Sequence, residues 1–127
     1  MAPILKLLLG LALICSLTVG GDRQCSKNSL KITQDRTGEL FRSKPVWRVK
    51  ITNDCPCTQL DVILRCKGFQ TVKEVDTGPN KPVLAKSGDE CLLNDGRPIY
   101  AHKNFSFIYA FGTRCTFRPL SSRIACS

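Results

Sequence analysis

Side chains that enzymes commonly use for catalysis are scarce in this sequence. His102 is the only histidine among the 127 residues, so a Ser-His-Asp or Cys-His site would depend on it alone. No Asp-x-Asp pair is present to hold the metal of a nucleotide-sugar transferase, and no glycine-rich loop of the phosphate-cradling kind occurs. The ten acidic residues are dispersed and offer no favoured pair for glycoside hydrolysis. The sequence therefore predicts a binding protein rather than an enzyme, without catalytic residues or a cofactor.

Clusters of positive charge along the chain are also lacking. The sequence has 19 Lys and Arg against 10 Asp and Glu, a formal net charge of +9, yet no two basic residues are adjacent. A nucleic-acid-binding arm or a polybasic membrane segment would normally be clustered. We therefore expect a dispersed basic surface, with no nucleic-acid partner and no stable membrane insertion. The alternative is long-range attraction to an acidic receptor face or to an anionic wall polymer.

Only one long apolar run occurs, and it lies at the N-terminus. Residues 7–19 carry no charge, follow Lys6 and lead into small residues that suit a signal-peptidase site near Gly21. The run is shorter than the roughly 20 apolar residues that a membrane-spanning helix needs. We expect a cleaved signal peptide over residues 1–21, a single domain over residues 22–127, and secretion to the extracellular space.

Cysteine, by contrast, is abundant. Cys15 falls within the expected signal peptide, which leaves seven cysteines: Cys25, Cys55, Cys57, Cys66, Cys91, Cys115 and Cys126. In a small secreted domain this density predicts a disulfide framework. A zinc site is the rival interpretation, but the C-x-C spacing and the single histidine do not suit one, so we expect no metal. Disulfide geometry disfavours a bond within Cys55-Pro56-Cys57, so each of these two cysteines is expected to pair with a distant partner that the sequence leaves open.

No stretch shows an apolar stripe three helical turns long. Instead, apolar and polar residues alternate, as in strands with one buried face. The alternating apolar positions are Trp47, Val49 and Ile51, then Leu60, Val62, Leu64 and Cys66, and finally the aromatic ladder of Phe105, Phe107, Tyr109 and Phe111. We predict an all-β fold, a small disulfide-stapled β-sandwich, in which the aromatic ladder faces the core.

Two stretches carry turn signals. Asn94-Asp95-Gly96 lies between two apolar runs and predicts a β-hairpin, because Asp-Gly tolerates the positive φ of tight hairpin turns. Residues 76–90 are rich in glycine and proline and are predicted to form the longest loop, a reasonable contact surface.

Several segments together resemble the plant Tapetum Determinant family of secreted cysteine-rich proteins. They are "CSKNSLKITQDRTG", "VWRVKITNDCPCTQLDVILRCKGFQTVKEVD", "DECLLNDGRPIYAHKNFSFIYAF" and the final "IAC". The founding member is an extracellular ligand of a leucine-rich-repeat receptor kinase that sets cell fate in the anther. The resemblance therefore implies a ligand acting in the apoplast on the extracellular domain of such a receptor, in reproductive development. It also implies that six cysteines form three disulfides, namely Cys25, Cys55, Cys57, Cys66, Cys91 and Cys126.

Cys115 has no counterpart in the family pattern. It is expected to be a free thiol in a monomer, with a disulfide-linked dimer as the alternative, and the flanking Arg114 and Arg118 are expected to favour its thiolate. Asn104-Phe105-Ser106 fits the N-glycosylation sequon, and both a glycan and an unused sequon remain open. The alternative function for the whole chain is a cationic defence or cell-wall polysaccharide-binding module.

Overall fold

The structure is a computed structural model that describes residues 25–73 and 83–126. The predicted signal peptide lies outside the described residues and stays a prediction. The described part contains two one-turn 3₁₀ helices, η1 (Lys27–Ser29) and η2 (Asn94–Gly96). Its strands are β1 (Leu30–Phe41), β2 (Lys44–Asn53), β3 (Thr58–Arg65), β4 (Leu84–Ser87), β5 (Glu90–Leu93), β6 (Asn104–Ala110) and β7 (Arg118–Ala125).

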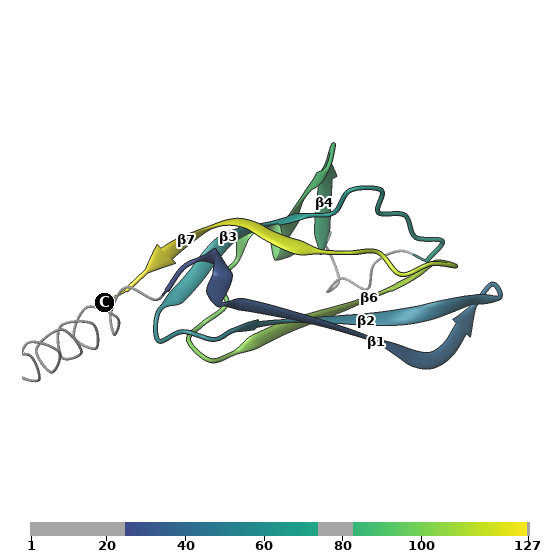
Figure 1. Cartoon of the computed structure of the whole chain (residues 1–127), viewed down its shortest axis with the longest axis horizontal. Coiled ribbons are helices and arrows are strands. Elements are labelled where there is room, and N and C mark those ends of the chain that lie inside the picture. Colours follow the sequence, from purple (N-terminus) through teal and green to yellow (C-terminus); the bar gives the residue numbers. More distant parts are fainter. Residues whose placement is uncertain (1–24, 74–82, 127) are drawn as a thin grey trace, which may run out of the picture.

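The strands form two antiparallel sheets stacked face to face (Figure 1). One sheet has the strand order β1-β2-β6, and the other has the order β4-β5-β3-β7. The all-β prediction and the predicted sandwich are confirmed. Sequence analysis had not identified β1 as a strand, because the polar residues Gln34 and Arg36 interrupt the apolar positions on the side of β1 that pairs with Val49 and Trp47.

The core lies between the two sheets and follows the predicted alternation. Inward positions on β2, β3 and β6 are at most 2% exposed: Val49, Ile51, Val62, Leu64, Phe107 and Tyr109. Phe117, which just precedes β7, packs edge-on against Phe107 at a ring separation of 5.6 Å. Edge-on packing suits the aromatic quadrupole, so the aromatic ladder covers the core as predicted.

The beginning of β3 departs from strict alternation. The register between β3 and β7 shifts between Leu60 and Ile63, and Asp61 has a φ of 50°. One extra residue in a strand reverses the direction of the side chains that precede it. Gln59 is therefore fully buried, at 0% exposure, while Leu60 is only partly buried. The predicted inward position of Leu60 is wrong for this reason.

Gln59 belongs to a buried polar cluster with Asn53. The Gln59 amide donates to the Ser26 carbonyl at 2.9 Å and to Asn53 Oδ1 at 3.1 Å, and its Oε1 accepts from the Ser122 hydroxyl at 2.6 Å. The Asn53 amide donates to the carbonyls of Cys57 and Ile99. The cluster joins both sheets at one end of the sandwich through hydrogen bonds that satisfy buried polar groups.

The predicted hairpin at Asn94-Asp95-Gly96 is wrong. All three residues have positive φ and form η2, after which the chain leaves β5 and bridges to β3 through Ile99. Pro98 follows closely and has no backbone N–H for a returning strand to use. Glycine suits position 96 because its φ is 78°, and a Cβ there would also force the Asp61 carboxylate, 2.7 Å away, to shift.

The tight hairpin lies in the stretch that was predicted to be a loop. β4 and β5 pair through a two-residue turn containing Gly88, whose φ is 62°. The loop prediction for residues 76–90 is therefore wrong over β4, and its residues 76–82 lie outside the described part of the chain.

Three disulfides join strands and segments that are distant in the sequence. The bonded pairs are Cys25–Cys55, Cys57–Cys126 and Cys66–Cys91, with Cα separations of 5.5, 4.7 and 6.0 Å. Cys55 and Cys57 each bond a cysteine 30 or 69 residues away rather than each other. The first two bonds hold the end of the sandwich at which the described chain begins and finishes, which we call the clamped end.

Candidate binding surface

Three segments meet at the opposite end of the sandwich, to the right in Figure 1. They are residues 36–45, 65–73 and 110–118. The Phe111 N–H donates to the carbonyl of Pro45, and the Val72 N–H donates to the carbonyl of Ala110, at 2.8 Å. Arg65 at the end of β3 is the register partner of Arg118 at the start of β7. These contacts make the three segments one continuous surface.

This surface is strongly basic, and we call it the basic end. Glu39 is the one acidic residue in its three segments. Against it stand eight cations: Arg36, Arg42, Lys44, Arg65, Lys67, Lys73, Arg114 and Arg118. They are far apart in the sequence, and sequence reasoning missed the cluster because only strand pairing brings them together.

The tip of the β1–β2 hairpin adds apolar groups to the basic end. Arg42 and Ser43 both have positive φ and form the tight turn. Leu40 is 65% exposed, and the ring of Phe41 has the Arg42 guanidinium at 5.2 Å and the Lys73 ammonium at 5.4 Å from its centroid. Such cation–π contacts hold long cationic side chains in place. Phenylalanine and arginine are both enriched at protein–protein interfaces, and the exposed leucine adds apolar area beside them.

A cleft of about 390 Å³ lies where β3 and β7 leave the sheet. Its lining residues are Arg65, Lys67, Thr116 and Arg118, and we call it the arginine cleft. All four side chains are exposed. None of them forms an ion pair or a side-chain hydrogen bond with any residue in the described ranges 25–73 and 83–126.

The Cys66–Cys91 disulfide attaches the basic end to the core of the sandwich. Both sulfur-bearing residues are at 0% exposure, and the Cys66 N–H donates to the Asp89 carbonyl at 2.8 Å. Segment 65–73 is therefore tied to β5 immediately beside Arg65 and Lys67. Because this backbone is already held by a covalent bond, less conformational entropy is lost when the segment binds a partner.

Cys115 is a free, half-buried thiol at the basic end. Its N–H donates to the Tyr109 hydroxyl at 2.8 Å, and its carbonyl accepts from the Gln34 amide at 2.8 Å. Burial raises the pKa of the Cys115 thiol, and Lys86 opposes that rise. The prediction that the flanking arginines favour the thiolate is therefore wrong, because desolvation is the larger effect. Burial likewise raises the pKa of Tyr109 to about 12.

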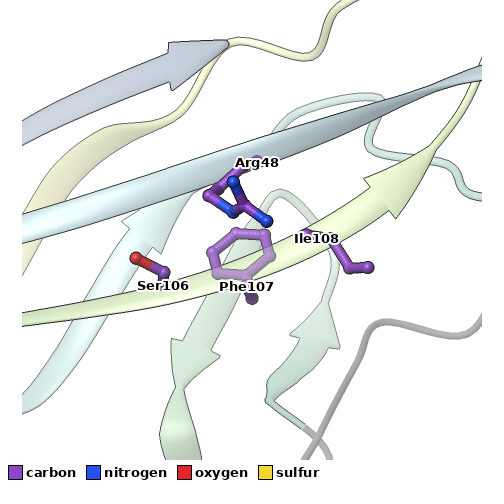
Figure 2. Close-up of a pocket in the computed structure, with 4 residues that line it drawn as sticks. All are labelled: Arg48, Ser106, Phe107 and Ile108. Atoms are coloured by element: carbon purple, nitrogen blue, oxygen red, sulfur yellow. The ribbon is translucent and has the colours of Figure 1, made fainter. Parts of the chain in front are cut away.

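The predicted sequon lies on the outer face of the three-stranded sheet. Asn104 is exposed at the start of β6, and Ser106 is the next residue on the same face. A shallow depression of about 200 Å³ is found farther along β6, beside Arg48 of β2 (Figure 2). It carries a single cation, so it is a weaker candidate than the arginine cleft. A glycan on Asn104 would also stand over this face.

Comparison with known proteins identifies the family of this chain. Residues 26–127 match the family described as Tapetum determinant 1, C-terminal. The chain belongs to the Tapetum determinant 1 family. The resemblance inferred from the sequence is thereby confirmed.

One relative matches this chain over nearly its full length, and two others match it over half of their own length or less. An uncharacterized protein of Arabidopsis thaliana is 32% identical over 129 aligned positions, which cover 99% of both chains. TPD1 protein homolog 1 of Arabidopsis thaliana is 32% identical over 69% of this chain and 49% of its own length. TPD1 protein homolog 1A of rice (Oryza sativa subsp. japonica) is 33% identical over 65% of this chain and 38% of its own. The chain thus spans half or less of these two homologues. No solved structure matches it.

The Tapetum determinant 1 match covers the whole described sandwich, including the basic end and five of the six bonded cysteines. Within the described ranges, no group of three or more His, Cys, Asp and Glu side chains is arranged to hold a metal ion. No helix in those ranges has both the length and the apolar character needed to cross a bilayer.

Proposed function

We propose that this protein is a secreted ligand for the extracellular domain of a leucine-rich-repeat receptor kinase, acting in plant cell-fate specification in reproductive tissue. Membership of the Tapetum determinant 1 family supports this proposal. The three disulfides support secretion, because such bonds persist in oxidising compartments. The receptor contact is made by the basic end, and the clamped end faces away from the receptor.

The observation that carries the proposal is the charge of the basic end, eight cations against one acidic residue. An acidic surface on the receptor would attract this end over a Debye length of about 8 Å at physiological salt and would orient the ligand as it approaches. Charge gives speed and specificity, whereas affinity comes from desolvated anchors. Leu40 and Phe41 at the hairpin tip supply such anchors.

Receptor binding is tested with protein secreted from cells that express the full-length chain. The secreted protein is used to pull down a panel of leucine-rich-repeat receptor kinase ectodomains, and complexes are analysed for stoichiometry. We expect one ectodomain to form a one-to-one complex. The proposal fails if no ectodomain binds.

A matched pair of variants tests whether the basic end makes the contact. Lys44→Glu/Lys73→Glu reverses two charges at the basic end, and Lys27→Glu/Lys103→Glu reverses two at the clamped end. Both lower the net charge equally. We expect the first variant to slow association about tenfold at low salt and the second to slow it less than about threefold. If both variants slow association equally, the effect comes from net charge, and the basic end is not the contact surface.

The arginine cleft favours one other function, a cell-wall polysaccharide-binding module, because it holds three cations without internal partners. Polyanion binding would weaken steeply with salt and would saturate without a fixed stoichiometry. A receptor complex retains a one-to-one ratio and much of its affinity, since its anchors are apolar. Titration at two salt concentrations separates the two functions.

A further inference from the structure

Two arginines face each other across neighbouring strands in the arginine cleft. Arg65 of β3 and Arg118 of β7 are register partners, so their side chains leave the same outer face of the four-stranded sheet side by side. Like charges directly opposite one another on a sheet are destabilising. An anion bound between the two guanidinium groups would relieve this repulsion.

No internal anion lies between them. Glu90 of β5 is the register partner of Arg65 on the other side, yet within the described ranges it forms no ion pair with Arg65. Lys67 and the hydroxyl-bearing Thr116 complete the cleft. The guanidinium groups of the two arginines can each bind a carboxylate through two parallel hydrogen bonds. The Lys67 ammonium adds a positive charge, and the Thr116 hydroxyl adds one more donor.

The positive charge of the cleft does not extend along the sheet. Farther along β7, Arg123 is already engaged by Asp61, with Nε and Oδ2 3.1 Å apart. On the side of β5, the residue next to Arg65 in this row is Glu90. A long anionic polymer laid across this face in either direction would meet a carboxylate. A compact group of carboxylates would not.

The geometry points to the arginine cleft as a binding site for the clustered Asp or Glu side chains of an acidic segment on a partner protein. The inference rests on the proposed function in one respect, namely that the partner is the receptor ectodomain. The backbone that carries Arg65 and Lys67 is held in place, because both residues flank Cys66, which is bonded to Cys91. Binding therefore orders few side chains beyond those that make the contact.

The test uses two probes with six carboxylates each: a peptide of six glutamates with an acetylated N-terminus and an amidated C-terminus, and a hexamer of galacturonic acid. Each is titrated into the secreted, disulfide-intact protein at low salt, with amide chemical shifts and calorimetry as readouts. The cleft variant is Arg65→Gln/Arg118→Gln. The matched control is Arg48→Gln/Lys50→Gln, which removes two exposed charges from the outer face of the other sheet.

We expect the peptide to saturate one site, with shifts confined to residues 65–67 and 116–118. Since each exposed ion pair contributes a factor of a few, the cleft variant should bind about tenfold more weakly, and the control less than about twofold. Equal weakening in both variants, or no saturable peptide site, would overturn the inference. Tighter binding of the uronic acid hexamer at the cleft would also overturn it, in favour of a polysaccharide site.

The ectodomain found by pull-down separates this inference from the proposed function. If that ectodomain binds the wild type and the cleft variant equally well, the cleft is not its binding site, and the ligand function stands. If the peptide saturates the cleft but no ectodomain binds, the receptor function is refuted and the acidic-segment site stands.

Discussion

Replacing Gln59 with leucine tests the buried polar cluster at the clamped end. The substitution keeps the side-chain volume but removes the hydrogen bonds to the Ser26 carbonyl, Asn53 Oδ1 and the Ser122 hydroxyl, together with a weak one to Cys55 Sγ. Asn53 is at 0% exposure, whereas both serines retain some access to water. One buried acceptor left without its partner costs about 1–3 kcal/mol, and the two partly solvated groups add less. After the gain from burying leucine, we expect a net loss of about 2 kcal/mol in the free energy of unfolding.

The measurement is guanidinium unfolding at pH 7 without reductant, followed by the fluorescence of Trp47, the only tryptophan. Gln70→Leu is the control, because Gln70 is exposed and should change stability by less than about 0.5 kcal/mol. If Leu60 occupied the core position, as strict alternation predicts, Gln59→Leu would be nearly silent. A loss no larger than that of the control would therefore refute both the cluster and the bulge.

Four further predictions concern the disulfides, titration, the free thiol and the sequon. Replacing both Cys57 and Cys126 by serine should destabilise the protein by about 4 kcal/mol in guanidinium unfolding, because this bond spans 69 residues. The pKa of Tyr109 is raised to about 12 from an unfolded value of about 10, so its neutral form stabilises the folded protein equally at every pH below about 10. The free energy of unfolding should decrease between about pH 10 and 12, and Tyr109→Phe should remove this decrease. Cys115→Ser should migrate like the wild type on a non-reducing gel, and a dimer band lost only in the variant would contradict the monomer. Deglycosylation should lower the mass of the secreted wild type but not of Asn104→Gln, and an unchanged wild-type mass would mean an unused sequon.

Much of the fold could be predicted from the sequence because strand alternation is a local property. The positions of Val49, Ile51, Phe107 and Tyr109 are buried as the period of two requires, since successive side chains on a strand point to opposite faces. Spacing and context of the cysteines were also sufficient to identify the family. The errors arose where backbone geometry overrode the pattern, as at the bulge that buries Gln59.

The sequence by itself determined the composition of the surface: an excess of basic residues, none adjacent, and few groups suited to catalysis. Only the tertiary structure decided where that charge lies. Arg65 and Arg118 are 53 residues apart in the chain, yet antiparallel pairing makes them neighbours across two strands. Charge–charge interaction depends on distance in space and not on separation along the chain. A set of cations that is dispersed in the sequence therefore becomes, in the folded protein, one basic end opposite the clamped end.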